Sequence, residues 1–243
     1  MYGKVRLYRQ GFPSCAYAVI IYTMKGCESF RPKGVILDMD GLMLETEKPL
    51  LPVWFKAGKL FGREIKEKTA MDAIGKTGRD IRLVCMRDLG QDFPYDDFHR
   101  EFNRLATLEM EKGIALKSGL VVLLDLLSFM NIPFAVATST KRKWALWKLE
   151  KAGILDRFSV IVCGDEVTRG KPAPDIFLAA AEKMGLSPSD CIGFEDSPAG
   201  LQGLHSAGIP SIFIKDMIEP PEEILATVWK RCNNLAEAAE LFK

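Results

Sequence analysis

A short apolar stretch that ends in two aspartates constrains this chain more than any other feature. Residues 35–42 read Val-Ile-Leu-Asp-Met-Asp-Gly-Leu, which predicts one buried strand followed by a sharp turn at the glycine. Side chains alternate along a strand, so we expect Asp38 and Asp40 to leave its end pointing the same way. Two carboxylates this close repel each other unless a cation or a shared proton compensates, and Mg²⁺ prefers oxygen ligands. We therefore expect a metal-assisted phosphoryl-transfer site, the alternative being an acidic loop without function.

Composition and charge exclude several classes of function. The 243 residues are 48% hydrophobic and 27% charged, as in ordinary globular proteins, and their formal net charge is +1. No overall field would recruit nucleic acid or a membrane surface, so we expect neither as a partner. The apolar run 120–127 is broken by Asp125 and is too short to cross a bilayer.

The cysteines and the N-terminal residues bear on cellular location. The six cysteines are scattered without a Cys-x-x-Cys pair, which favours reduced thiols and a cytoplasmic protein over disulfides or a zinc site. The apolar run 15–22 loosely imitates a signal peptide. We expect residues 1–32 to be an N-terminal extension instead, disordered or, over residues 1–23, not part of the native protein.

The pattern of apolar residues changes once along the chain. Residues 47–117 show only helical patterns, over about 47–61, 79–89 and 94–112. From residue 118 onward, helices alternate with apolar strands, expected at 133–138, 159–163, 191–194 and 210–214 and, weakly, at 227–232. The expected fold class is α/β, a Rossmann-like parallel sheet with helices on both faces. Residues 33–46 and 118–243 would form this core domain, and residues 47–117 would form an inserted helical-bundle cap domain.

Polar side chains follow the expected strands where such sheets bind ligands. Thr138 and Ser139 follow the second strand, Lys171 lies beyond the third, and Glu195 and Asp196 follow the fourth. Because ligands bind beyond the carboxyl ends of parallel strands, these groups should meet Asp38 and Asp40 at one rim. Taken alone, Glu195-Asp196 could equally begin a helix, and Thr138 could merely end a strand.

Four motifs together resemble those of a known superfamily. They are Asp-Met-Asp-Gly-Leu at 38–42, Thr138 after its strand, Gly-Lys-Pro-Ala-Pro-Asp at 170–175 and Gly-Phe-Glu-Asp-Ser-Pro-Ala-Gly at 193–200. In this combination the chain resembles the haloacid dehalogenase (HAD)-like superfamily, in particular its phosphatase and β-phosphoglucomutase-like branch. That branch carries a helical cap between the first and second motifs, where residues 47–117 lie.

The resemblance implies a role for each motif residue. Asp38 would be the nucleophile that becomes an aspartyl phosphate, and Asp40 would move protons. The cofactor Mg²⁺ would lie between Asp38, the backbone carbonyl of Asp40 and Asp196, with Glu195 binding it directly or through water.

Further residues would bind the substrate. Thr138 and the neighbouring backbone at Ser139 would bind phosphate oxygens, and Lys171 would offset negative charge. The turn that holds Lys76 and Arg79 would close over the core and contact a substrate anion or sugar hydroxyls. Exposed basic residues at a helix start are also common without such a role.

The resulting prediction is a Mg²⁺-dependent phosphatase that hydrolyses a small phosphorylated metabolite and acts as a monomer. One alternative is a sugar-phosphate mutase; its relatives carry a histidine where this chain has Pro49 and Leu50, which favours hydrolysis. An alternative of another class is a non-catalytic protein that binds a phosphometabolite, although no motif residue is missing. Nucleotide-binding P-loops are disfavoured, since Gly75-Lys76 has Ala70 where that motif needs its first glycine.

Overall fold

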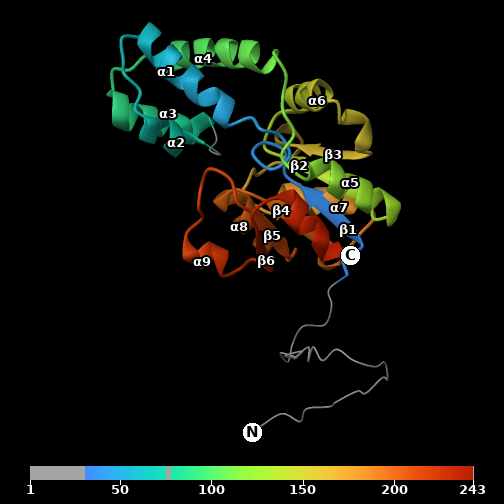
Figure 1. Cartoon of the computed structure of the whole chain (residues 1–243). Coiled ribbons are helices and arrows are strands. Elements are labelled where there is room, and N and C mark those ends of the chain that lie inside the picture. The colour runs from blue at the N-terminus through green and yellow to red at the C-terminus, as the bar shows by residue number, and fades with distance from the viewer. Residues whose placement is uncertain (1–30, 75–77, 243) are drawn as a thin grey trace, which may run out of the picture. The chain divides into compact units, whose positions relative to one another are not determined.

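A parallel sheet of six strands forms the centre of the described part of the chain, in the order β3-β2-β1-β4-β5-β6 (Figure 1). The structure is a computed structural model, and it describes residues 31–74 and 78–242. By their contacts, residues Pro32–Lys243 form one unit. The expected N-terminal extension lies outside the described residues, except for residues 31 and 32.

The elements have the following bounds. The strands are β1 Gly34–Leu37, β2 Phe134–Thr138, β3 Val160–Cys163, β4 Cys191–Glu195, β5 Ser211–Ile214 and β6 Lys230–Cys232. The helices between β1 and β2 are α1 Leu51–Leu60, α2 Glu67–Ala73, α3 Gly78–Leu89, α4 Tyr95–Met110 and α5 Leu120–Phe129. The later helices are α6 Arg142–Lys151, α7 Asp175–Lys183, α8 Pro198–Ser206, α9 Glu222–Leu225 and α10 Leu235–Ala239.

Helices cover both faces of the sheet, as strand β4 shows. Gly193 faces α8, since a Cβ at this position would lie 2.2 Å from the Leu204 side chain. The next residue, Phe194, faces the other way and stacks on Phe242, just after α10, with ring centroids 6.3 Å apart. All four residues of β1 are buried, which explains why its sequence is apolar without alternation.

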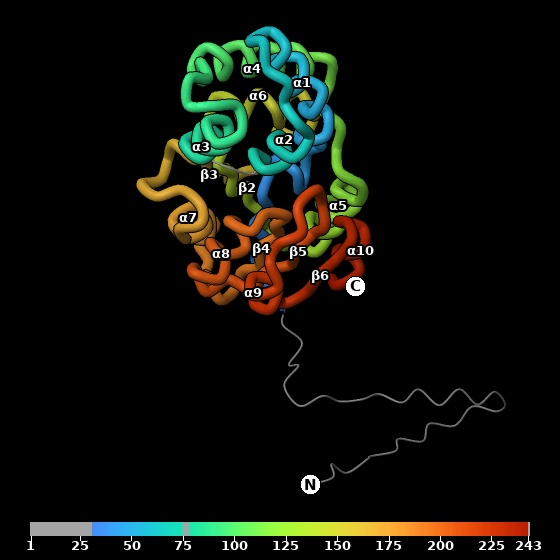
Figure 2. Tube along the Cα trace, turned by 90° about the vertical axis from the view of Figure 1, so that its left-hand side faces the viewer, coloured from blue at the N-terminus to red at the C-terminus, as the bar shows by residue number. Residues whose placement is uncertain are grey.

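Helices α1–α4 gather around a core of their own (Figure 2). Its centre is aromatic: the Trp54 ring lies 5.6 Å from that of Phe98 and 4.6 Å from that of Phe102. We call residues 48–110 the helical insertion. The two segments that join it to the sheet run side by side, because Glu45 donates a backbone hydrogen bond to Ala115 and Lys117 donates one to Met43.

The predicted fold class is confirmed, with differences in short elements. In the described part of residues 47–117 there is no strand, as expected. Helices α2 and α9 were not predicted; with seven and four residues they are too short to show a clear helical period. Among residues 31–74 and 78–242, no helix is long and apolar enough to cross a membrane.

Candidate active site

Asp38 follows β1 directly, at the sheet's carboxyl edge. Its backbone N–H donates to the carbonyl of Phe194 in β4 over 3.1 Å, which fixes the chain between the two strands. The residue is 7% exposed, and one carboxylate oxygen is bound by Lys171. Burial is the strongest influence on Asp38 and raises its pKa, while Lys171 opposes this. Asp38 therefore lies in a pocket where its charge depends on neighbouring cations.

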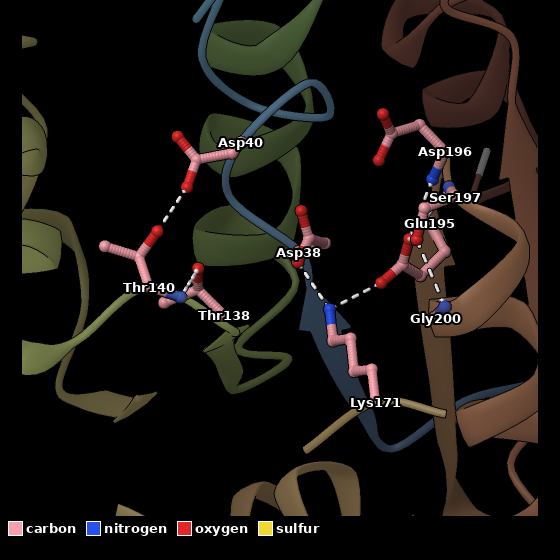
Figure 3. A network of polar contacts seen from close by, with 9 residues as sticks. All are labelled: Asp38, Asp40, Thr138, Thr140, Lys171, Glu195, Asp196, Ser197 and Gly200. Carbon is pink, nitrogen blue, oxygen red and sulfur yellow. Dashed lines mark hydrogen bonds and ion pairs between the residues drawn. The ribbon is translucent and has the colours of Figure 1, made fainter. Parts of the chain in front are cut away.

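Lys171 joins two buried carboxylates. Its ammonium contacts Asp38 and also Oε1 of Glu195, the latter over 2.5 Å, and its side chain is 6% exposed (Figure 3). Burial alone would lower the pKa of Lys171, but the two carboxylates outweigh it and raise that pKa well above its ordinary value. Lys171 is thus a fixed cation next to Asp38.

Glu195 is the last residue of β4 and is fully buried. While Oε1 binds Lys171, Oε2 accepts hydrogen bonds from the backbone N–H groups of Asp196 and Ser197 and from the Ser197 hydroxyl, over 2.9–3.0 Å. A Cβ on Gly200 would lie 1.8 Å from Oε1, so the glycine in the first turn of α8 makes room for this carboxylate. Glu195 therefore holds both Lys171 and the turn that carries Asp196.

Asp196 completes a group of acidic side chains that fits a divalent cation. One carboxylate oxygen each from Asp38, Glu195 and Asp196 lie within 4.8 Å of one another. Oδ1 of Asp196 is buried and has no hydrogen-bond partner among the described residues. Burial, and next the charges of Glu195 and Asp38, raise the pKa of Asp196 well above its ordinary value. A buried oxygen without a partner among carboxylates is where a hard cation would bind.

Gly41 allows Asp196 to approach the end of β1. Its φ of +83° lies in the left-handed region that favours glycine. A Cβ here would lie only 2.3 Å from Oδ2 of Asp196 and 3.5 Å from Oδ2 of Asp216. The glycine is therefore needed for the space beside it as well as for the turn.

Asp40 is held by partners different from those of Asp38. Lys148 of α6 donates to its Oδ1 over 2.6 Å, and the Thr140 hydroxyl donates to its Oδ2 over 2.7 Å. Burial would raise the pKa of Asp40, but Lys148 and Thr140 outweigh it and keep that pKa below its ordinary value. The two aspartates do not point the same way, because β1 ends at Leu37 and its alternation ends with it (Figure 3).

Thr138 ends β2 and is 1% exposed. Its hydroxyl oxygen accepts the backbone N–H of Thr140 over 3.1 Å, which shapes the turn after the strand. Ser139 is exposed and lines the same pocket as Thr138, Thr140 and Asp38. The sequence thus correctly placed Thr138 and Ser139 beside Asp38.

The helical insertion supplies the other side of this pocket, whose volume is about 420 Å³. Most of its lining there is apolar: Leu50, Trp54, Ala73, Ile74, Ile81, Phe102 and Met110. Glu47 also lines it, and burial, with smaller contributions from Asp40 and Asp216, raises the pKa of Glu47 to about 7. Arg79 is exposed at the start of α3 and does not line the pocket, while Lys76 lies outside the described residues.

Three charged pocket residues were not identified from the sequence. Lys148 looks like any lysine on a helix, Glu47 precedes an ordinary helix start, and Asp216 lies in a loop without a motif. Thr140 comes directly after Thr138 and Ser139 at the end of β2, and its position in this run of hydroxyl side chains was the available signal for it.

Comparisons with known proteins agree with this geometry. The family model of haloacid dehalogenase-like hydrolases matches residues 32–208. A bifunctional riboflavin kinase/FMN phosphatase of Arabidopsis thaliana is 30% identical over 75% of this chain; the match spans 48% of that protein, about half its length. Hexitol phosphatase A of Escherichia coli (strain K12) is 30% identical over 79% of this chain and 87% of that protein.

A solved structure shares the fold. The crystal structure of CbbY from Rhodobacter sphaeroides, in complex with phosphate, superposes with a TM-score of 0.72 at 24% identity and covers 85% of this chain and 96% of that one. The family model covers strands β1 to β4, the helical insertion and the acidic cluster alike. The chain therefore belongs to the haloacid dehalogenase-like hydrolases, and it is an enzyme of that family.

Proposed function

We propose that this hydrolase is a Mg²⁺-dependent phosphatase that acts on a small phosphomonoester through an aspartyl phosphate at Asp38. The observation that carries this proposal is the position of Asp38: one oxygen is fixed by Lys171, and the carboxylate borders both the pocket and the cluster with Asp196. A carboxylate held in this way can attack phosphorus without first having to be ordered.

The two aspartates would divide the reaction between them. An oxygen of Asp38 attacks phosphorus and the ester oxygen leaves, taking a proton from Asp40. Water then attacks the aspartyl phosphate and gives a proton to Asp40. This attack breaks the bond between phosphorus and Asp38, so that inorganic phosphate is released and Asp38 is restored. Lys148 favours ionised Asp40, as the second step requires. The negative charge of an arriving phosphate favours the protonated form that the first step requires.

The acidic cluster fits Mg²⁺ through the donors it offers. Asp38, Asp196 and the backbone carbonyl of Asp40 would hold the cation, which would supply positive charge that lets a phosphate approach a carboxylate. Glu195 has both oxygens occupied by Lys171 and by the turn at Ser197, which favours a contact through water over a direct bond.

The pocket indicates the size and character of the substrate. About 420 Å³ suits a phosphate with a small organic group, whose apolar parts would contact the helical insertion. The names of two relatives, phosphatases of FMN and of a hexitol, support phosphorylated metabolites as the substrate class. We propose that residues 47–117 act as a cap domain and that the enzyme is a cytoplasmic monomer.

Phosphate release from a panel of sugar phosphates, phosphoglycolate and nucleotides, with and without Mg²⁺, tests the proposal. We expect Mg²⁺-dependent release that Asp38→Asn abolishes and that Asp125→Asn, on the exposed face of α5, leaves unchanged. No release from any compound would contradict it. Conversion of β-glucose 1-phosphate to glucose 6-phosphate without release would indicate a mutase instead.

A further inference from the structure

Asp216 is a further buried carboxylate beside the acidic cluster, and it belongs to none of the sequence motifs. It follows β5, and its side chain is only 7% exposed. Its Oδ1 accepts a hydrogen bond from Lys117 over 2.6 Å. Its Oδ2 is buried without a hydrogen-bond partner among the described residues. A carboxylate oxygen in this state costs free energy unless something outside the protein binds it.

The free oxygen of Asp216 lies near the carboxylate of Asp196, beside the turn at Gly41. Asp216 lines the same pocket as both of them. The position of a Cβ on Gly41 would be 3.5 Å from Oδ2 of Asp216 and 2.3 Å from Oδ2 of Asp196, so the two carboxylates border the same side of this turn. Their mutual repulsion would be relieved by positive charge between them.

Mg²⁺ keeps several waters of hydration when protein carboxylates bind it. Those waters need acceptors, and outer carboxylates that accept from them orient the whole site. Asp38 and Asp196 are the direct carboxylate ligands of the proposed site, whereas Asp216 is not among the carboxylates whose oxygens lie within 4.8 Å of one another. It is suited to a water of the cation rather than to the cation itself.

The other oxygen of Asp216, Oδ1, is connected by ion pairs to both segments that join the helical insertion to the sheet. Lys117, on the second segment, also contacts Glu45 on the first over 3.0 Å. Lys48, just before α1, lies 3.4 Å from Glu45 and 3.9 Å from Asp216. The two segments pair here through the backbone bonds of Glu45 and Lys117. We call this paired region around Glu45 and Lys117 the base of the helical insertion. Asp216 thus lies beside the proposed cation site and also contacts this base through Lys117.

We propose that Asp216 is an outer-sphere ligand of the cation and couples cation binding to the base of the helical insertion through Lys117. Asp216 acts as a positioning residue: it touches neither the phosphorus nor the leaving group. The inference rests on the proposed function only in that a divalent cation binds at Asp38 and Asp196.

The first test measures cation binding without substrate. Mn²⁺, followed by electron paramagnetic resonance, is titrated into the full chain and into Asp216→Asn. Outer-sphere changes typically weaken metal binding about 10- to 100-fold, and we expect a loss in this range. Glu219→Gln, on the same loop and 58% exposed, removes an equal charge and should bind Mn²⁺ as the unaltered protein does. Asp216→Asn should fold, because Lys117 keeps Glu45 as its partner.

The second test measures coupling to the insertion. Hydrogen exchange of the backbone amides of Glu45 and Lys117 should slow when Mg²⁺ is added to the unaltered protein. In Lys117→Met, Mn²⁺ affinity should stay within about threefold, because Oδ2 of Asp216 remains. The slowing of these amides should nevertheless be lost, since the connection to the insertion is broken.

The outcomes separate this inference from the proposed function. Unchanged Mn²⁺ affinity in Asp216→Asn, or an equal loss in Glu219→Gln, would overturn it, as would a complete lack of Mn²⁺ binding by the unaltered protein. The expected losses in a protein that releases phosphate from no ester would support the role of Asp216 and contradict the phosphatase.

Discussion

Lys148 of α6 donates a hydrogen bond over 2.6 Å to Oδ1 of Asp40, a residue 108 positions earlier in the chain. Both side chains are mostly buried in the pocket wall, where an ion pair is screened less than at the surface. Lys148 therefore controls both where the Asp40 carboxylate lies and how readily it takes up a proton.

Replacing Lys148 by methionine should slow the enzyme. Without the cation, Asp40 loses a partner that orients it, and general acid–base catalysis is worth about 10²- to 10⁴-fold. We expect kcat to fall at least about tenfold, with a smaller change in KM. Lys151→Met, exposed on the same helix, is the matched control. Equal kcat values for the two variants would show that Lys148 has no part in the reaction.

Replacing Lys171 by methionine should destabilise the fold as well as inactivate the enzyme. The change leaves Asp38 and Glu195 buried without their shared cation, and breaking a buried pair in this way costs about 3–5 kcal/mol. Urea unfolding measures the loss. Lys183→Met, which removes an exposed pair with Glu166, should cost under about 1 kcal/mol. A loss of similar size in both variants would mean that Lys171 is not held as described.

Glu47 should make stability depend on pH. Its pKa in the folded state, about 7, exceeds its ordinary value of 4.5. Between these values the folded chain keeps a proton that the unfolded chain has lost, so stability falls as pH rises through this interval. Glu47→Gln removes the effect and should make the protein more stable than the unaltered chain by about 1–3 kcal/mol at pH 8, with little difference at pH 4. Urea unfolding across this range without metal checks this; parallel curves for the two proteins would refute it.

Alanine substitutions at Gly41 and Gly153 should distinguish the cost of left-handed backbone strain from the cost of steric crowding. Both have positive φ, +83° and +70°, but a Cβ on Gly153 would meet nothing within 4 Å. Gly153→Ala should cost only the left-handed backbone strain, about 1–2 kcal/mol. Gly41→Ala should cost more and should also abolish Mn²⁺ binding, because the new methyl group displaces Asp196. Mn²⁺ binding by Gly41→Ala with unchanged affinity would contradict the described approach of Asp196.

The sheet and the positions of its motif residues could be predicted because both depend on local patterns. Apolar runs such as residues 34–37 identify buried strands, and parallel strands bring the residues that follow them to one edge. Asp38, Thr138, Lys171 and Asp196 accordingly lie together in the pocket.

What escaped prediction depends on contacts between distant segments. The sequence around Lys148 is an ordinary helix, and only the packing of α6 beside the first turn shows that this lysine binds Asp40. Asp216 is likewise unremarkable until β5 places it against Gly41. Strand alternation predicts the wrong direction for the Asp40 side chain, because the strand ends at Leu37.

In the proposed mechanism Asp38 forms a covalent bond to phosphorus, and trapping that bond is the decisive experiment. The enzyme is mixed with Mg²⁺ and its best substrate, quenched in acid from milliseconds to seconds, and treated with borohydride, which reduces an acyl phosphate to an alcohol. Peptide mass spectrometry should then find homoserine at position 38, and none when substrate is omitted. Phosphate release with Asp38 unmodified at every time point, or reduction at another carboxylate, would show that Asp38 is not the nucleophile.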